Sequence, residues 1–368
     1  MFAQGLISRY TVFMESDSRK SLPHWRAIIL SLGIGILIGA GSLSIYAQKP
    51  VSPSPLLPRI LPMRKKLGAS KNFNFTNPLL LCDNTEPRKS VNLKPLENTL
   101  TSAIDNLIDD KNVAYISVYF RDLDKGRWTG VNENRAYSPA SLLKVPTMMA
   151  FLKFAETNPK MLSKAVFYEG SFDKNKPEYF KPEKSIQAGH SYTIEELIQY
   201  MVAYSDNNAT WLIFDNLNPK ALEEIYSDLE IDLPTDKNAD ITDFMTTKLY
   251  ARFFRVLYNT TYLNEEFSEK ALSLLSNYAF PRGLVEGIPK NLPIAEKFGE
   301  RNIQVKALDG PKKELHDCGI IYYPGHPYIL CVMTKGYNFD KLADAIKNIS
   351  RVAYTWVDEQ YKTDKVTP

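Results

Sequence analysis

The chain has only three cysteines and four histidines among its 368 residues. So few cysteines exclude a disulfide-stapled scaffold, which needs several bridges in a much shorter chain. The two histidines nearest each other, His316 and His326, lack the spacing of a metal-binding motif. The fold must therefore rest on a hydrophobic core, and the length is enough for one large domain or two small ones.

A basic face is absent from most of the chain. Residues 1–92 hold 12 lysines and arginines against 4 carboxylates, a balance of +8, whereas the whole chain carries only +3. The remaining residues therefore carry −5. Together with the lack of any RNA- or DNA-binding signature, this mildly acidic charge excludes nucleic acid as a partner.

Residues 27–47 contain no charge and consist mostly of Ile, Leu, Gly and Ala. About 20 apolar residues are what a membrane-spanning helix needs. Four basic residues precede the run, so the positive-inside rule predicts a cytoplasmic N-terminus and everything after Tyr46 outside. We therefore expect a single-pass protein of the cell membrane, with its main domain on the extracytoplasmic side. A signal peptide cleaved near Ala47 is the alternative.

Composition predicts the organisation of the remaining chain. Five prolines between positions 50 and 62 indicate a semi-extended linker, and the apolar run that begins at Asn77 indicates a segment that packs on the domain. The predicted parts are a cytoplasmic N-terminus (1–26), a transmembrane anchor (27–47), a Pro-rich basic linker (48–76), a packed pre-domain segment (77–92), the main domain (93–358) and a tail (359–368).

Hydrophobic periodicity predicts the elements of the main domain. Helices are expected at 93–110, 141–156, 193–202, 221–229, 242–258, 266–278 and 339–354. Strands are expected at 114–121, 127–131, 294–298, 304–308, 318–323 and 328–334. This order favours a mixed α/β (α+β) fold, with one antiparallel sheet built from both ends of the domain and a helical lobe inserted between them.

The residues with the clearest chemical potential are Ser141 and Lys144. If Pro139 and Ala140 open a helix, both side chains lie on one face, one turn apart. A serine hydroxyl becomes a nucleophile when a neighbouring base takes its proton, and a lysine is such a base when burial lowers its pKa. Alone, a Ser-x-x-Lys pair is more often an ordinary amphipathic helix, because the motif is so short.

Two further motifs follow in order. Ser205-Asp206-Asn207 comes directly after the helix whose capping box begins at Thr193, and Lys297-Phe298-Gly299 lies on a predicted strand. Ser-x-x-Lys, Ser-Asp-Asn and Lys-Thr-Gly together form the signature of class A β-lactamases and penicillin-binding proteins. From 93 to 350 the chain resembles a class A β-lactamase-type serine hydrolase. The resemblance implies a five-stranded antiparallel sheet beside an all-helical subdomain, with no cofactor.

The resemblance also implies roles for single residues. Ser141 would be the nucleophile, Lys144 the base that activates it and Ser205 the relay of a proton to the leaving nitrogen. Asn207 would hold the substrate's amide, and Lys297 would supply positive charge for a substrate carboxylate.

The Lys297-Phe298-Gly299 strand would line the substrate cleft. The oxyanion hole would use the backbone N–H groups of Ser141 and Glu300, because two such donors stabilise the charge of a tetrahedral intermediate.

Two departures from the family pattern affect the predicted activity. Phe298 replaces a hydroxyl residue that contributes a hydrogen bond to a substrate carboxylate. The Glu-x-x-Leu-Asn loop, whose glutamate activates the water that releases the acyl group, is absent from the sequence. The carboxylates near its expected place are more often caps or solvated loop charges, namely Glu230, Asp232, Asp236 and Asp240.

Three functions are therefore considered. The first is a hydrolase that forms an acyl-enzyme at Ser141 with a β-lactam or related amide, using a non-standard base for deacylation. The second is a D,D-peptidase or transpeptidase acting on wall peptides, which β-lactams acylate without efficient turnover. The third, a surface binding module with decayed machinery, is disfavoured because all three motifs retain their polar residues.

The three cysteines allow three single pairings. Cys318 and Cys331 are symmetric about the Pro324-Gly325 turn, so a simple hairpin register sets them opposite each other. Cys82 paired with Cys331 is mildly preferred, because it would fix the pre-domain segment to the sheet. Three buried thiols are the remaining alternative.

Overall fold

A computed structural model describes residues 74–77, 89–109, 111–171, 173–234, 243–277, 280–303 and 310–362. Several predictions fall outside this part of the chain: the cytoplasmic segment, the anchor at 27–47, most of the linker, Cys82, the strand at 304–308, Asp236 and Asp240.

The centre of the fold is a five-stranded antiparallel sheet in the order β2-β1-β7-β6-β5. Its strands are β1 (Val113–Asp122), β2 (Trp128–Val131), β5 (Ile294–Asn302), β6 (Lys313–Ile321) and β7 (Tyr328–Gly336). The first two strands come from one end of the domain and the last three from the other. The predicted sheet from both ends is therefore confirmed, and β1 and β7 pair across a separation of more than 200 residues.

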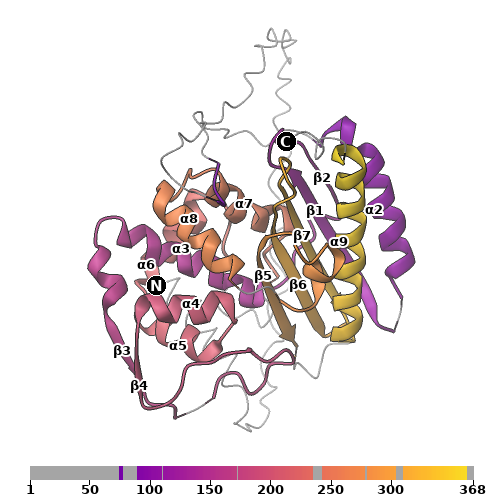
Figure 1. The fold of residues 1–368 in the computed structure, drawn as a ribbon. Helices are drawn as coiled ribbons and strands as arrows, with labels where there is room; N and C mark the ends of the chain where they lie inside the picture. The colour runs from indigo at the N-terminus through magenta and orange to yellow at the C-terminus, as the bar shows by residue number, and fades with distance from the viewer. Residues whose placement is uncertain are drawn as a thin grey trace, which may run out of the picture.

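Helices cover both faces of the sheet. Figure 1 shows α2 (Lys94–Leu107) and α9 (Phe339–Tyr361) on one face and the helical lobe on the other. Side chains of a strand point alternately to opposite faces, so β7 sends Leu330 and Val332 to the α2/α9 core and Cys331 and Met333 to the core shared with the helical lobe. The sequence of β7 is therefore a continuous apolar run from Tyr328 to Met333.

The helical lobe lies between β2 and β5 in the sequence. Its helices are α3 (Lys144–Ala155), α4 (Ile194–Ala203), α5 (Asn207–Asp215), α6 (Pro219–Asp228), α7 (Thr247–Tyr258) and α8 (Glu265–Ser276). The capping box predicted for α4 is confirmed, because the Thr193 side chain accepts from Glu196 N and Glu196 accepts from Thr193 N. Four short 3₁₀ helices are also described, namely η1 (Val91–Leu93), η2 (Ala140–Leu143), η3 (Pro159–Ser163) and η4 (Gly283–Gly287).

The lobe differs from the prediction in two places. A small two-stranded sheet, which was not predicted, pairs β3 (Ala165–Tyr168) with β4 (His190–Thr193), and the two strands flank the segment 169–189. Helix α5 begins within the Ser-Asp-Asn motif and was not predicted. The C-terminal helix is also longer than expected and continues to Tyr361.

The predicted membrane location requires a correction. No helix among the described residues is long and apolar enough to span a bilayer. The 27–47 run on which that prediction rested lies outside those residues. No membrane location is therefore assigned to the protein.

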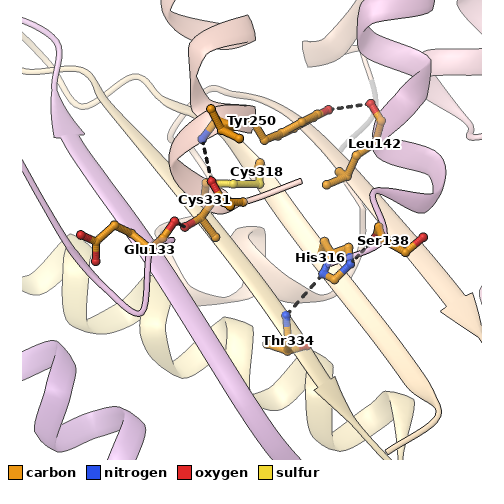
Figure 2. Close-up of a disulfide and its surroundings, with 11 residues drawn as sticks. Glu133, Ser138, Leu142, Tyr250, His316, Cys318, Cys331 and Thr334 are labelled. Carbon is orange, nitrogen blue, oxygen red and sulfur yellow. Dashed lines mark hydrogen bonds between the residues drawn. A yellow bond between two sulfur atoms is a disulfide. The ribbon is translucent and has the colours of Figure 1, made fainter. Parts of the chain in front are cut away.

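The preferred cysteine pairing is wrong. Cys318 and Cys331 form the disulfide, and they lie directly opposite each other in the β6–β7 register, with 4.0 Å between their Cα atoms. Figure 2 shows this bridge between the two neighbouring strands. The hairpin alone brings the two side chains together, so Cys331 is not available to Cys82.

Residues 74–77 lie on the helical lobe. The backbone N–H groups of Asn74, Phe75 and Thr76 donate to the carboxylate of Glu269 on α8 at 2.6–3.0 Å. The Phe75 ring meets Tyr322 edge to face, with 5.2 Å between centroids. This short segment is therefore held to the domain by both polar and aromatic contacts.

Candidate active site

Ser141 and Lys144 lie on one continuous turn, as predicted. Ser141 is in the 3₁₀ helix η2, and Lys144 is the first residue of α3. In a 3₁₀ helix residues three apart eclipse each other, so the two side chains share a face. The sequence predicted an α-helix from Pro139 onward, and the first turn is instead the tighter 3₁₀ form.

The turn that carries Ser141 is held by contacts from the sheet and from α7. Ala140 has a φ of 47°, a left-handed conformation that side-chain-bearing residues rarely adopt. Tyr250 Oη donates to the carbonyl of Leu142 at 2.9 Å, and His316 Nε2 lies 2.9 Å from the carbonyl of Ser138. Figure 2 shows both contacts on either side of η2. Strain of this kind persists where surrounding contacts over-determine the backbone.

His316 is neutral in this position. Its side chain is fully buried, and burial lowers its pKa to about 4. The ring therefore donates one proton to Ser138 and accepts the N–H of Thr334 at 3.4 Å on its other nitrogen. It acts as a support for the serine turn and has no contact that indicates metal binding.

The Lys144 side chain is fully buried and uses all three of its donor positions. Nζ donates to the carbonyl of Ser205 at 2.8 Å, to its Oγ at 3.0 Å and to Oδ1 of Asn207 at 2.7 Å. Burial lowers the pKa of Lys144 to about 8, while the nearby carboxylates of Glu178, Asp206 and Glu300 act in the opposite direction. A substantial neutral fraction therefore exists near pH 8, and the neutral amine is the form that accepts a proton.

The Ser-Asp-Asn segment joins α4 to α5. Ser205 has a φ of 57°, and Asp206 is the N-cap of α5, accepting the N–H of Asn208 at 2.9 Å. The buried Asp206 carboxylate also accepts from Asn175 at 2.7 Å and from the Ile186 N–H at 2.9 Å. Asp206 thus fixes the motif to the loop that precedes β4.

The edge strand β5 lies against the serine turn. A β-carbon built on Gly299 would stand 3.0 Å from Leu142 N and 3.1 Å from both Ser141 N and Pro139 O. These are backbone atoms that cannot move aside easily, so glycine permits the close approach. The next residue, Glu300, is thereby brought beside Ser141, and an edge strand has N–H groups that no neighbouring strand uses.

Lys297 is buried beside Lys144. Its Nζ donates to the carbonyl of Phe298 at 2.9 Å and lies 4.2 Å from the centroid of the Phe298 ring. Burial, followed by the charge of Lys144, holds the pKa of Lys297 well below its usual range.

Two buried acids, Glu296 and Asp317, lie close enough to Lys297 to act on its charge. Burial raises the pKa of Asp317 to about 7, and burial with the neighbouring Asp317 raises the pKa of Glu296 well above its usual range. Glu296 and Asp317 together therefore retain one proton near neutral pH. The pair then carries one negative charge, which balances a single cation.

Phe298 packs in an aromatic cluster. Its ring stacks on Phe280 with 4.1 Å between centroids, and Phe180 meets both rings edge to face. Phe339 and Tyr179 extend the same cluster.

Residues 175–181 cross from the helical lobe to the sheet and form a strap over the motif residues. Glu178 Oε1 accepts from Asn207 Nδ2 at 2.7 Å. The carboxylate of Glu300 accepts the N–H groups of Tyr179 at 2.5 Å and Phe180 at 3.1 Å. On the far side Tyr179 Oη donates to Asp340 Oδ2 at 2.6 Å. Ser141 itself is only 8% exposed.

Glu178 and the Glu300 side chain were missed by the sequence analysis. The two carboxyl groups hydrogen-bond each other, and burial together with Glu178 raises the pKa of Glu300 to about 8. One signal was available, because Tyr179-Phe180 is the single pair of adjacent aromatics in the polar segment 169–189. Nothing in the sequence indicates that this pair meets Glu300.

Two of the four carboxylates near the expected place of the Glu-x-x-Leu-Asn loop, Glu230 and Asp232, lie on the surface. The Glu230 side chain is 88% exposed and lies 3.9 Å from Arg252, and Asp232 is also exposed. Among the described residues, no group of three or more His, Cys, Asp or Glu has the arrangement of a metal site.

Several solved structures resemble this fold. A mutant of PBP-A, solved as an acyl-enzyme complex with penicillin G, is 19% identical with a TM-score of 0.59, over 73% of this chain and 97% of that one. A β-lactamase from Sphaerobacter thermophilus is 18% identical with a TM-score of 0.58, over 74% and 99%. One from Xanthomonas campestris is 18% identical with a TM-score of 0.58, over 71% and 98%. At these identities the likeness supports the fold alone.

The curated proteins contain no match to this chain. A family model, by contrast, covers most of the domain. The model described as the beta-lactamase enzyme family matches residues 99–357, which is more than half of the chain. That span contains the sheet, the helical lobe and all three motifs, and the chain therefore belongs to the beta-lactamase enzyme family.

Proposed function

We propose that this protein is a serine hydrolase of the class A β-lactamase type, which forms an acyl-enzyme at Ser141 with a β-lactam or related amide. The observation that carries the proposal is the position of Lys144. Its buried amine bonds both Ser205 and Asn207, so one residue connects the first two motifs. A decayed binding module would have no reason to retain a fully buried lysine, since burial of a charge is costly.

Acylation begins at the serine hydroxyl. The neutral amine of Lys144 takes the Ser141 proton as Oγ attacks the substrate's carbonyl carbon, forming a tetrahedral oxyanion. The N–H groups of Ser141 and Glu300 donate to that oxyanion. Ser205 then passes a proton to the substrate nitrogen, the C–N bond breaks, and the amine leaves. Oγ remains bonded to the acyl carbon, and Lys144 returns to its starting state by passing its proton through Ser205.

Asn207 would hold the substrate's amide in this scheme. Its Nδ2 is already bonded to Glu178, so a substrate must displace that carboxylate to reach it. Lys297 and the β5 backbone would line the opposite wall. Binding therefore requires the strap over the site to shift.

The second function, a peptidase or transpeptidase of wall peptides, is favoured by one observation. Glu230 and Asp232 lie on the surface, and the Glu-x-x-Leu-Asn loop is absent from the sequence. Without a dedicated water-activating glutamate the acyl group would persist until Lys144 activates water or an amine acceptor attacks. The two functions share the acylation step and differ in how fast the ester is broken.

Intact-mass analysis of the full-length protein tests the proposal. The chain is mixed with penicillin G, a chromogenic cephalosporin or a fluorophosphonate, and the mass is followed over time. We expect one adduct at Ser141, an acyl group with the β-lactams and a phosphonyl group with the fluorophosphonate, and none in Ser141→Ala, which should keep the fold. Ser273→Ala, on α8, is the matched control and should label like the unaltered protein.

The time course separates the two functions. Rapid return to the unmodified mass with chromophore turnover supports the hydrolase. A long-lived adduct supports the peptidase-like enzyme. Labelling that survives Ser141→Ala, or the absence of an adduct with every reagent, would refute the assignment of the nucleophile.

A further inference from the structure

The family motif usually provides a place for a substrate carboxylate, and that place is altered here. Phe298 stands where a hydroxyl residue would donate to the carboxylate, and its ring stacks on Phe280. The cation of the motif, Lys297, is 2% exposed and already donates to the Phe298 carbonyl. An incoming anion would therefore meet the Phe298 ring and the Lys297 amine, which is already hydrogen-bonded to a carbonyl and whose pKa is lowered.

Two carboxyl groups, those of Glu178 and Glu300, lie beside the same site. Glu178 bonds the Asn207 amide, whose other atom bonds Lys144, so it is separated from the catalytic amine by one side chain. Glu300 is adjacent to Gly299, which packs on the backbone of Ser141. The two carboxyls hydrogen-bond each other, and Glu300 retains its proton near neutral pH because burial and Glu178 raise its pKa to about 8. Release of that proton would leave two negative charges beside the reactive serine.

Aromatic rings border the acid pair. Tyr179 and Phe180 follow Glu178 in the chain, and their N–H groups bond Glu300. Phe339 stacks on Tyr179, with 5.0 Å between centroids, and Lys313 Nζ already lies 5.1 Å from the Phe339 ring. Carboxylates combined with aromatic faces are the chemistry that binds ammonium and guanidinium groups.

We propose that the natural acyl donor carries a cationic group, an ammonium or guanidinium, that binds Glu178 and Glu300 beside these rings. This inference rests on the proposed function and specifies its substrate class. The cation takes the place of the proton on Glu300 and draws Glu178 away from Asn207, which is then free to hold the substrate's amide. Glu178 and Glu300 are thus specificity-determining residues, and a substrate with a carboxylate at this position is disfavoured.

Three p-nitrophenyl esters of similar length test the inference with the full-length protein. Their acyl groups are 6-aminohexanoyl (cationic), hexanoyl (neutral) and 5-carboxypentanoyl (anionic). Acylation of Ser141 is followed at pH 7 by the burst of p-nitrophenol and by intact mass. We expect the cationic ester to acylate at least about tenfold faster than the anionic one, the ratio that one charge-assisted hydrogen bond supplies.

The variants Glu178→Gln and Glu300→Gln keep the size of each side chain and remove its charge. We expect the cation-to-anion ratio to fall towards one in both, with the rate of the neutral ester as the internal measure of an intact site. Glu266→Gln, an exposed glutamate on α8, should leave the ratio unchanged. A preference for the anionic ester, or a ratio that survives both variants, overturns the inference while the acyl-enzyme assignment stands.

A second measurement needs no variant. Fluorophosphonate labelling of the unaltered protein is repeated with cadaverine or with glutarate as competitor. Slower labelling with cadaverine supports the inference, and slower labelling with glutarate overturns it. If neither the esters nor the fluorophosphonate label Ser141, the proposed function fails and the inference fails with it.

Discussion

The Nζ of Lys144 lies 2.7 Å from Oδ1 of Asn207, and the other end of the same amide donates to Glu178 at 2.7 Å. The Asn207 amide thus bridges the buried amine of Lys144 and the carboxylate of Glu178 by hydrogen bonds. The negative charge of Glu178 is the largest influence that raises the pKa of Lys144 against the effect of burial. The protonation of this buried amine therefore depends on a residue outside the three motifs.

The rate of acylation should follow the neutral fraction of Lys144. With a pKa of about 8 for this amine, we expect the rate to rise about tenfold per pH unit below pH 8 and to level off above it. Glu178→Gln removes a charge that favours the ammonium, so its profile should move to lower pH. Fluorophosphonate labelling between pH 5.5 and 9.5 measures both profiles. The control Glu266→Gln should keep the profile of the unaltered protein. A Glu178→Gln profile that does not move, or that moves to higher pH, would contradict this role of Glu178.

Gly299→Ala should slow acylation. Its new β-carbon would stand about 3 Å from the backbone of Ser141 and Leu142, so β5 must move away from the serine turn. Loss of one oxyanion donor slows such reactions by roughly 10²–10³, and we expect about 100-fold.

Gly130→Ala is the matched control for this variant. Gly130 lies on β2, at the opposite edge of the sheet from β5. A β-carbon at this position would stand 2.7 Å from the Val118 carbonyl oxygen. This variant should lower the melting temperature without slowing acylation of the folded protein. Equal acylation rates in the two glycine variants would argue against an oxyanion role for this part of β5.

The sequence was informative where the interaction is local. The capping box of Thr193 and Glu196 was predicted because both partners lie within one turn, and the hairpin symmetry of Cys318 and Cys331 was visible for the same reason. The preference for Cys82 failed because it ignored the register that the hairpin itself imposes. Local sequence therefore predicts the elements and the alignment of neighbouring strands.

The strap could not be predicted in this way. Glu178 and Glu300 are 122 positions apart, and their contact depends on how the helical lobe packs against the sheet. The strands β3 and β4 were missed for a related reason, since each has only four residues and the two pair across the intervening segment 169–189. The three motifs identified the residues that we propose as catalytic, and only the structure gives the groups that surround them.

Tyr179→Phe should speed acylation. The Tyr179 hydroxyl bonds Asp340 at 2.6 Å and helps to hold the strap over Ser141. A hydrogen bond of this kind contributes about 0.5–1.5 kcal/mol, so its loss should raise the acylation rate roughly two- to tenfold. Fluorophosphonate labelling at pH 8 measures the effect. Tyr115→Phe, an exposed tyrosine on β1, is the control, and a Tyr179→Phe rate equal to the control's would mean that the strap does not limit access.

The Glu300 carboxyl should make stability depend on pH. Its pKa is raised from 4.5 to about 8, so the folded state holds a proton that the unfolded chain releases in this range, and stability is lost as the pH rises from about 4.5 to about 8. Glu300→Gln removes this loss. We expect the variant to match the unaltered protein near pH 4.5 and to exceed its free energy of unfolding by on the order of 4 kcal/mol at pH 8. Urea unfolding across this range measures the difference. A difference that stays constant with pH, as expected for Glu266→Gln, would mean that Glu300 is ionised throughout.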